Sequence, residues 1–233
     1  MDPNISQLNL ASIIAYLITD GHVQVRLRNN RNKYDYFGLF SKDENQLRKF
    51  NNLVHKTFGV KGKIREWGKR KFGTSKGCII SNAKIVKYLV ECGVPYGDKV
   101  ISKFQIQDWI LNGDNEIIKT FLKICFTCEG SIFYSKKYDR WIIHFTNHKE
   151  ISIVDDGKKY LESFRELLKR FGVETSNVTI NEKYIRPKDN KMICCLRFRI
   201  NKKQSIINYG KYIGFDTKDK NSKLKQSMKW ARN

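Results

Sequence analysis

Alternating apolar and polar residues predict short strands in both halves of the chain. In residues 23–28, three apolar side chains alternate with Gln24, Arg26 and Arg28, the period of two that is typical of a strand with one buried face. Similar patterns predict strands near 22–30, 33–41, 60–71, 73–81, 130–137, 140–148, 176–185 and 191–200. Each predicted sheet therefore has an apolar face for a core and a polar face directed outward.

Runs with helical periodicity lie between these strands. Two apolar runs, Ser12–Gly21 and Phe121–Gly130, have helical character, and each ends with an acid followed by glycine. We expect Gly21 to end the first helix in the left-handed conformation that glycine accepts readily. Amphipathic segments predict further helices near 43–58, 82–92, 155–171 and 202–213.

The predicted elements repeat along the chain. Phe58–Val60 reads Phe-Gly-Val and returns as Phe171–Val173, each time closing an amphipathic helix. Cys92–Val94 corresponds in the same way to Ile213–Phe215. The order helix, strand, strand, helix, strand, strand, helix thus occurs twice, which indicates an internal repeat.

This repeat predicts an α+β fold with two pseudo-symmetric αββαββα domains. We place the N-terminal domain at 1–96, a linker at 97–114 and the C-terminal domain at 115–233. The C-terminal tail from Asp216 is basic and has few apolar residues, so a disordered or loosely helical tail is expected.

The charge of the chain restricts its partners. It carries 45 Lys and Arg against 23 Asp and Glu, a formal net charge of +22. Such an excess favours a polyanion, with nucleic acid first and a basic membrane-surface protein as the competitor. No apolar run approaches the ~20 residues of a membrane span, and the cations are spread along the whole chain.

Targeting signals and cysteines bear on the compartment. The N-terminus has no basic segment ahead of its apolar run, so no secretory or transit signal is expected. The six cysteines lie mostly in apolar segments, which favours reduced core thiols in an intracellular protein. Prokaryotic cytoplasm and an organelle both remain open.

The outward positions of the predicted strands are candidates for reading DNA. Arginine pairs bidentately with guanine and asparagine or glutamine with adenine in the major groove, whereas a solvated sheet face would need no such chemistry. The net charge favours the binding face. The candidate residues are Gln24, Arg26, Arg28, Lys61, Lys63, Arg65, Lys69, Lys71, Arg140, His144, His148, Asn177, Thr179, Asn181, Lys183, Arg197 and Arg199.

The two acids that end the apolar helices occupy unfavourable positions. Asp20 and Glu129 each meet the negative end of a helix dipole, where cations are preferred. If the two helices pack side by side, the carboxylates come together and repel each other unless a cation lies between them. Mg²⁺ suits carboxylates, water and phosphate oxygens and promotes phosphodiester hydrolysis. Both acids are therefore candidate metal ligands and catalytic residues.

These two stretches resemble the paired motifs of LAGLIDADG homing endonucleases. The first copy covers Ile13–Gly21 and the second Leu122–Gly130, with the lead-in Gln107–Leu111 ahead of the second. The resemblance extends through the strands and helices of both halves. Two copies at this spacing, each followed by the expected strands in a basic chain, are fairly specific.

The resemblance implies a monomer whose motif helices form the interdomain interface and whose antiparallel sheets form a saddle over DNA. It implies cleavage of a long asymmetric or pseudo-palindromic duplex, leaving short 3′ overhangs, by an enzyme that is intron-encoded. Asp20 and Glu129 would hold Mg²⁺, with Mn²⁺ or Ca²⁺ able to replace it in binding. By position, Lys42 and Lys203 are expected to tune the attacking water, although plain phosphate contacts explain them equally well.

Other interpretations remain beside this one. The spacing of Cys125, Cys128, His144 and His148 fits a two-Cys, two-His zinc finger, but the cysteines fall in a predicted helix and the histidines on a predicted strand. An RNA-binding maturase on the same fold, with its own intron RNA as partner, is the main functional alternative. An intein endonuclease is disfavoured because the chain starts at a methionine and lacks a terminal His-Asn.

Overall fold

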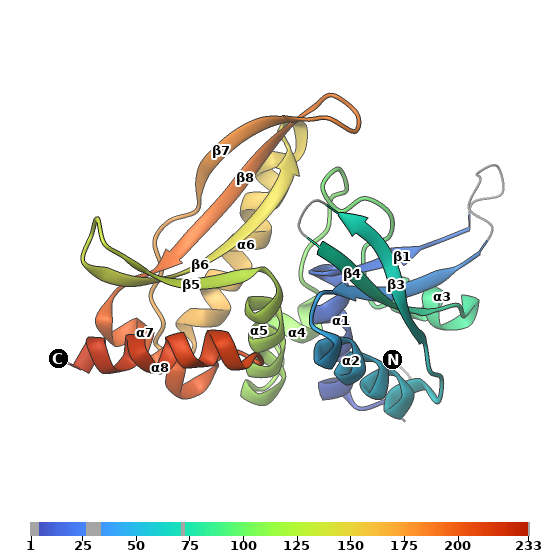
Figure 1. The fold of residues 1–233 in the computed structure, drawn as a ribbon, viewed down its shortest axis with the longest axis horizontal. Coiled ribbons are helices and arrows are strands. Elements are labelled where there is room, and N and C mark those ends of the chain that lie inside the picture. The colour runs from blue at the N-terminus through green and yellow to red at the C-terminus, as the bar shows by residue number, and fades with distance from the viewer. Residues whose placement is uncertain (1–4, 27–33, 71–72, 233) are drawn as a thin grey trace. The chain divides into compact units, whose positions relative to one another are not determined.

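The computed structural model describes residues 5–26, 34–70 and 73–232, which form two compact units, Met1–Lys99 and Val100–Asn233. Figure 1 shows that each unit combines one sheet with several helices. Each unit is described by itself below. In the described part of the chain, no helix is both long and apolar enough to cross a bilayer.

The first unit has the predicted order of helices and strands. Its elements are α1 (Gln7–Ile18), β1 (Gly21–Gln24), β2 (Tyr36–Ser41), α2 (Glu44–Phe58), β3 (Lys63–Arg70), β4 (Gly73–Ile80) and α3 (Ala83–Glu91). The strands form one antiparallel sheet in the order β1-β2-β4-β3.

The second unit repeats this order and adds to it. Its elements are α4 (Asp108–Leu111), α5 (Asn115–Glu129), β5 (Gly130–Ser135), β6 (Arg140–Glu150), a 3-10 turn η1 (Ile151–Ile153), α6 (Val154–Lys169), β7 (Thr179–Arg186), β8 (Lys191–Ile200), α7 (Lys203–Tyr212) and α8 (Lys218–Arg232). Its antiparallel sheet has the order β5-β6-β8-β7, which is the order of the first sheet. The predicted α+β fold with two αββαββα repeats is confirmed.

Aromatic side chains fill the core between each sheet and its helices. In the first unit, Tyr16 of α1 meets Phe50 of α2 edge to face at 5.6 Å, and Phe37 of β2 completes the cluster. In the second, Phe126 of α5 lies 4.8 Å from Phe145 of β6. All five rings are buried, so the helices cover one face of each sheet and leave the other free. We call this free face the outer face.

Gly21 was expected to behave as a left-handed helix cap, and this prediction is wrong. Gly21 and Gly130 both begin strands, and neither has a positive φ. A Cβ at Gly21 would lie 2.6 Å from the Cα of Leu17, and one at Gly130 would lie 2.5 Å from the carbonyl oxygen of Phe126. Glycine is needed here because the chain turns back against its own helix.

The glycines of the other repeat landmarks do adopt left-handed conformations. Gly59, Gly93, Gly172 and Gly214 all have φ between 66° and 88°. Each follows the helix that the repeat predicted it to close. The backbone therefore repeats at these four positions, although few side chains around them are shared.

The C-terminal tail differs from the expectation of a disordered or loosely helical segment. Residues from Lys218 onward form the regular helix α8, which packs against α7 and β5. Leu224, Ser227 and Ala231 are buried on its inner side. Their helical spacing gives α8 a narrow apolar stripe, and a count of apolar residues alone could not show it.

Candidate nucleic-acid interface and carboxylate sites

A lysine lies at the carboxyl end of α1, beside Asp20. The Lys99 ammonium donates hydrogen bonds to the carbonyl oxygens of Leu17 at 3.1 Å and Gly21 at 2.8 Å, and also to that of Thr19. Asp20 itself is partly exposed between α1 and β1. The cation satisfies carbonyls that a helix end leaves unpaired, and it offsets the negative end of the dipole.

The second unit has the same arrangement at the end of α5. The Lys220 ammonium donates to the carbonyl oxygen of Gly130 at 2.6 Å and to that of Thr127. Glu129 is partly exposed at the junction with β5. The backbone N–H of Asp216 also donates to the Thr127 hydroxyl at 2.8 Å, so the segment before α8 is fixed to the end of α5.

Sequence reasoning missed these two lysines. Lys99 and Lys220 occupy equivalent places in the repeat, because each follows by six residues the glycine that closes a repeat, Gly93 or Gly214. Aligning the two halves on those glycines would have found the pair. Each half therefore brings one carboxylate and one ammonium to the carboxyl end of its motif helix.

The position of Lys203 contradicts its expected place at a catalytic centre. Its ammonium lies over the Trp230 ring, 5.3 Å from the centroid. Trp230 and Lys220 are separated by about 15 Å of α8, given the rise of ~1.5 Å per residue. Because Lys220 marks the Glu129 end of that helix, Lys203 lies at the far end.

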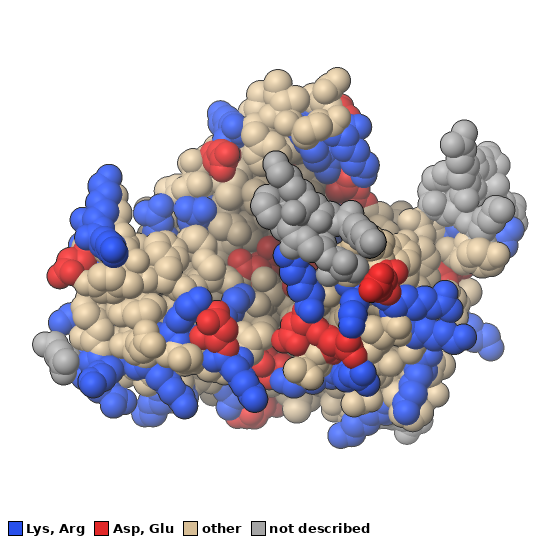
Figure 2. Space-filling view, viewed as in Figure 1, with Lys and Arg blue, Asp and Glu red and all other residues tan. Residues whose placement is uncertain are grey.

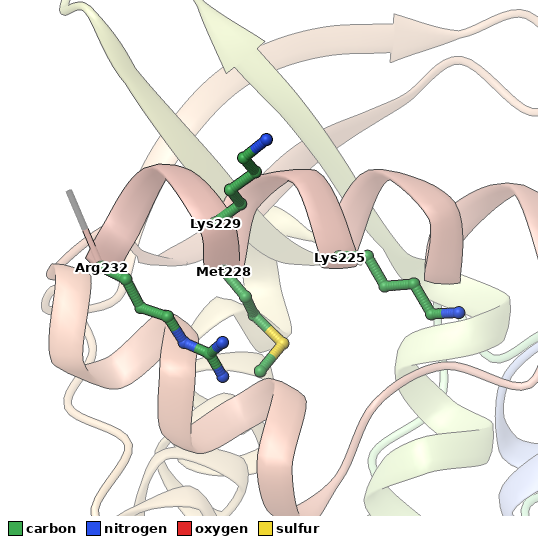
Figure 3. Close-up of a pocket in the computed structure, with 4 residues that line it drawn as sticks. All are labelled: Lys225, Met228, Lys229 and Arg232. Atoms are coloured by element: carbon green, nitrogen blue, oxygen red, sulfur yellow. The ribbon is translucent and has the colours of Figure 1, made fainter.

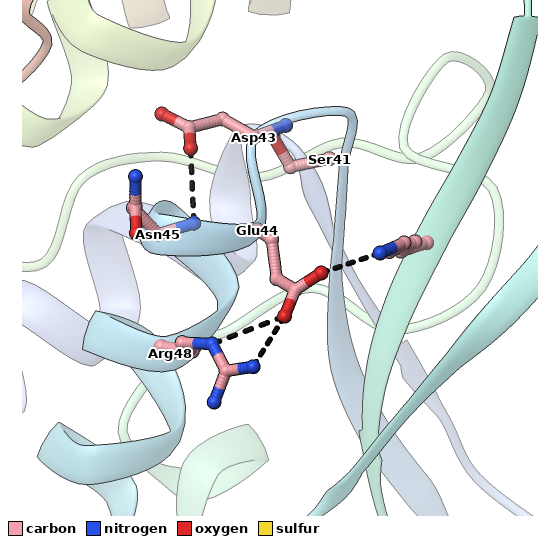
Figure 4. Close-up of polar contacts among 6 residues, drawn as sticks. Ser41, Asp43, Glu44, Asn45 and Arg48 are labelled. Carbon is pink, nitrogen blue, oxygen red and sulfur yellow. Dashed lines mark hydrogen bonds and ion pairs between the residues drawn. The ribbon is translucent and has the colours of Figure 1, made fainter.

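Lys42 lies just ahead of α2, between Ser41 and Asp43, which Figure 4 draws together with Glu44 and its partners. It is exposed between β2 and Asp43, which caps the helix. Glu44 pairs with Lys76 of β4 and with Arg48 of its own helix. These hydrogen bonds, the one from Lys76 first, lower the pKa of Glu44. The role of Lys42 toward a water molecule stays a prediction.

The donor set at each helix end fits a hard divalent ion that keeps much of its hydration. Within the described residues no group of three His, Cys, Asp or Glu side chains gathers, so neither unit offers an all-protein cage. Mg²⁺ is usually held by one or two carboxylates together with waters and substrate phosphates. A single partly exposed carboxylate, Asp20 or Glu129, at each end fits that mode.

On the outer face of the second sheet, a histidine lies among cations. His144 pairs in register with Ser131 and with Arg199, and its Nε2 hydrogen-bonds the Ser131 hydroxyl. Burial, followed by the charges of Arg197, Arg199 and Lys220, lowers the pKa of His144 to about 4. The imidazole is therefore neutral at physiological pH, and its Nδ1 has no partner among the described residues.

The edge strand β7 departs from strict alternation. The pairing of β7 with β8 shifts between Ile180 and Glu182, so Asn181 is bulged and the parity reverses after it. Lys183 was expected to share the face of Thr179 and Asn181. Its Cα instead pairs with that of Cys194, whose side chain is buried in the core, so that prediction is wrong. A bulge inserts one residue, and alternation along a sequence cannot show it.

The reversed parity brings other side chains to the outer face of the second sheet. Tyr184 lies 5.9 Å from His148, ring to ring, and its hydroxyl is 3.4 Å from the histidine Nδ1. Glu182 is near enough to oppose the lowering of the His148 pKa that burial causes. Strict alternation from Thr179 would have placed Tyr184 on the other side of β7, and it was not among the candidates.

The remaining candidates of the second unit are polar and accessible, and several hold one another in place. Arg197 donates to Asn181 Oδ1 at 2.9 Å, and Arg165 of α6 donates to Asn177 Oδ1 at 3.2 Å, just ahead of β7. Thr179 is exposed on β7, and Arg140 is exposed at the start of β6.

The first sheet exposes cations along its edge strand. Lys61, Lys63 and Arg65 are exposed, as predicted, and Trp67 lies at a bulge between Glu66 and Gly68. The single parity expected from Lys61 through Lys71 is therefore interrupted at Trp67, after which Lys69 pairs with Thr74. The side chain of Lys69 and the residues Arg28 and Lys71 lie outside the described part of the chain.

At the opposite edge of this sheet, β1 and the segment after it carry two more candidates. Gln24 is half-buried, and its side chain donates to the carbonyl oxygen of Val25 at 3.1 Å. Arg26 follows β1 with its side chain exposed, while its backbone N–H donates to Asp35 Oδ1 at 2.6 Å.

Cations also cover surfaces away from the sheets. Figure 2 shows Lys and Arg side chains widely distributed over the visible face, with fewer acids between them. One open hollow on α8, of about 330 Å³, is lined by Lys225, Met228, Lys229 and Arg232 (Figure 3). It lies toward the Trp230 end of α8, away from Lys220. Such a surface favours polyanions in general and does not discriminate among them.

The proteins that are similar in sequence match this chain over only a small part of their own length. The tRNA-splicing ligase RtcB of Methanopyrus kandleri is 25% identical over 193 residues, which are 78% of this chain. The replication factor C small subunit of Methanocaldococcus jannaschii is 27% identical over 210 residues, 87% of this chain. The chain spans only 19% and 10% of these two proteins.

Solved structures share the whole fold. The homing endonuclease I-WcaI bound to its DNA recognition sequence superposes with a TM-score of 0.56 at 16% identity, covering 95% of this chain and 87% of its own. I-DmoI in complex with DNA and Ca gives a TM-score of 0.58 at 16% identity, covering 94% and 98%. Identities this low show the fold alone.

Membership rests on the family model. The model of the LAGLIDADG-like domain matches residues 7–93 and again residues 116–214. The two matches coincide with the two αββαββα repeats, and the acids Asp20 and Glu129 fall at the same place in each. The chain belongs to the family of LAGLIDADG-like domains.

Proposed function

We propose that this protein is a site-specific endonuclease that hydrolyses phosphodiesters of double-stranded DNA. The observation that carries the proposal is the repeated carboxyl end of the motif helix, where Asp20 lies beside Lys99 and Glu129 beside Lys220. A protein that only bound nucleic acid would have no need for an acid at either place. Solved relatives of the same fold are complexes with DNA and with Mn, Ca or Mg.

Each carboxylate would hold a divalent ion, with Mg²⁺ as the physiological candidate and Mn²⁺ or Ca²⁺ able to take its place in binding. Such an ion lowers the pKa of bound water and stabilises the charge that develops on the phosphodiester. The ammonium of Lys99 or Lys220 fixes the helix end beside the acid. The Lys and Arg side chains of the outer faces bind phosphates. The side-chain amides and guanidinium groups of the same faces read base edges in the major groove.

The finer points belong to the same proposal. One chain carries both carboxylates, so a monomer suffices to cut two strands, and short 3′ overhangs are the expected product. Because the repeats differ in sequence, the target is expected to be long and asymmetric or only pseudo-palindromic. Lys42 is retained as a residue that orients water or phosphate near Asp20, and an intron-encoded origin fits a chain of this kind.

The decisive experiment incubates the purified chain with a randomised duplex library and Mg²⁺, followed by sequencing of the cut ends. Asp20→Asn and Glu129→Gln should abolish cleavage while leaving binding in Ca²⁺ nearly unchanged, because each removes metal charge but few phosphate contacts. Asp219→Asn is the matched control, since this acid lies on α8 and pairs only with Lys223 among the described residues. Cleavage by either site variant at the wild-type rate would refute the assignment.

The same samples test the RNA-binding alternative. If the wild type cuts no duplex in Mg²⁺ or Mn²⁺ but binds a structured intron RNA more tightly than duplex DNA at equal salt, the maturase interpretation replaces the endonuclease. Specific cleavage of duplex DNA decides against it as the sole function.

A further inference from the structure

A large apolar ring lies exposed among the cations of the first sheet. Trp67 is 49% exposed, and it occupies the bulge that interrupts pairing between Glu66 and Gly68. A bulge takes its residue out of the ladder and redirects the side chain, and bulges are frequent next to functional sites. A lone exposed ring needs no explanation, but exposed apolar side chains that lie together inside a polar rim indicate a contact surface.

Phe40 holds the tryptophan in one orientation. The two rings lie 5.1 Å apart with their planes at 50°. A Cβ at Gly77 would lie 2.9 Å from two ring atoms of Phe40 and 3.7 Å from the Cβ of Trp67. The glycine therefore lets the Phe40 ring lie directly on the sheet, where it supports Trp67. We call Phe40 and Trp67 the aromatic patch.

The aromatic patch belongs to the row of residues that would face DNA. Gly77 pairs in register with Phe40 on one side and with Arg65 on the other, so all three lie on the outer face. Arg65 and Lys63 are exposed beside the patch. Cations at this position can bind phosphates and guanine edges. An apolar ring between them can contact an apolar group of a base.

The equivalent position of the second sheet has the opposite chemistry. There the bulged residue of the edge strand is Asn181, whose Oδ1 accepts a hydrogen bond from Arg197 at 2.9 Å. The edge strands β3 and β7 thus each present one bulged side chain on the outer face, supported by a side chain of another strand of the same sheet. One side chain is an aromatic ring and the other is an amide, which recognises adenine.

We propose that the aromatic patch reads the 5-methyl group of a thymine in the major groove, and thereby sets the sequence preference of the half-site bound by the first unit. This inference rests on the proposed function. The thymine methyl is the one apolar group that unmodified base pairs display in the major groove. An aromatic ring held over Gly77 contacts it without leaving a buried polar group unpaired.

The test replaces single methyl groups in DNA. The full chain first selects its target from a randomised duplex library in Ca²⁺. Each thymine of that target is then replaced, one at a time, by deoxyuridine, which lacks only the methyl group. At one or two positions of one half-site we expect about fourfold weaker wild-type binding, equivalent to the ~0.8 kcal/mol of one buried methyl or methylene group.

Variants assign the effect to the patch. Trp67→Ala should bind the thymine and deoxyuridine duplexes equally at those positions and keep its preferences elsewhere. Trp67→Gln should shift the preference there toward adenine, because glutamine pairs with the adenine edge. Tyr212→Ala removes another exposed aromatic ring, one on α7 rather than on an outer face, and should leave the discrimination intact. Thermal melting confirms that each variant is folded.

Several results would overturn the inference. Wild-type binding that ignores every thymine-to-deoxyuridine change would do so, as would Trp67→Ala retaining the discrimination. If Trp67→Ala weakens the binding of all duplexes equally, the patch contributes to affinity without reading the sequence. If Trp67→Ala loses self-association and keeps its base preference, the patch binds a second copy of the chain. If the wild type enriches no duplex at all, the proposed function fails, and this inference fails with it.

Discussion

Replacing Gly21 with alanine tests the steric account of the motif glycine. The added Cβ would lie 2.6 Å from the Cα of Leu17, 2.9 Å from the carbonyl oxygen of Tyr16 and 3.0 Å from that of Gly38. All three atoms belong to the backbone, so no side chain can rotate away. The strand β1 must move by roughly 1 Å from the end of α1 to restore ordinary contact distances near 3.5–4 Å.

The size of the effect follows from what that movement disturbs. Overpacking of this kind costs about 1–3 kcal/mol. The Lys99 hydrogen bond to the Gly21 carbonyl, 2.8 Å long, is weakened as well, and bonds to charged groups contribute about 1.5–3 kcal/mol each. A loss of about 2–4 kcal/mol in the free energy of unfolding is expected, which lowers the melting temperature by roughly 10–20 °C in a unit of this size.

Denaturant unfolding and thermal melting of three variants distinguish this account from a left-handed cap. Gly21→Asn should be at least as unstable as Gly21→Ala, because asparagine also has a Cβ. A left-handed cap would instead tolerate asparagine better than alanine. Gly68→Ala is the matched control, since nothing lies within 4 Å of its added Cβ and its φ is not positive. Gly21→Ala with wild-type stability, or rescue by asparagine, would refute the reasoning.

Three further predictions concern charge. The pKa of His144 should be about 4 by NMR titration of its imidazole and should rise in Arg199→Gln. Because this pKa is lower in the folded than in the unfolded chain, the stability that the neutral imidazole contributes is complete above pH 6.5 and disappears as pH falls toward 4. A titration midpoint near 6.5 for His144 would contradict the structure. Lys149→Met should cost about 3 kcal/mol, since this fully buried ammonium bonds the Ser102 carbonyl and lies 3.8 Å from Asp156, whereas the exposed Lys158→Met should cost less than about 1 kcal/mol in the same denaturant assay. DNA affinity should fall steeply and linearly on a logarithmic salt scale, and a flat response would argue against phosphate contacts.

The pattern of apolar positions predicted most elements of the fold because strands and helices bury one face at characteristic periods. The helices near 43–58 and 82–92 and the strand at 191–200 lie within one or two residues of the observed α2, α3 and β8. Where the sequence failed, a contact between distant segments decided the outcome. The stripe of α8 is stable only against α7 and β5, and the parity of β7 depends on one bulged residue.

The candidate site shows the same division. Asp20 and Glu129 could be chosen from the sequence because a carboxylate at a helix carboxyl end is locally unfavourable and therefore conspicuous. Lys99 and Lys220 have no unusual local sequence, and they become informative only when the chain brings them to the helix ends. Lys203 was selected by its place along the chain, which says little about distance in space.

The two repeats keep their backbone devices and exchange the side chains placed on them. Both edge strands carry a bulge, and it presents Trp67 on Phe40 in one sheet and Asn181 on Arg197 in the other. Both motif helices end in an acid, and at each end a lysine ammonium donates hydrogen bonds to backbone carbonyl oxygens. The chemistry common to the two halves would therefore act on the phosphate backbone, which is the same at every base pair. The bulge residues, which differ between the halves, would contact base edges, which differ from one base pair to the next. A target read by these two faces would present a thymine methyl group to the ring of Trp67 and an adenine edge to the amide of Asn181.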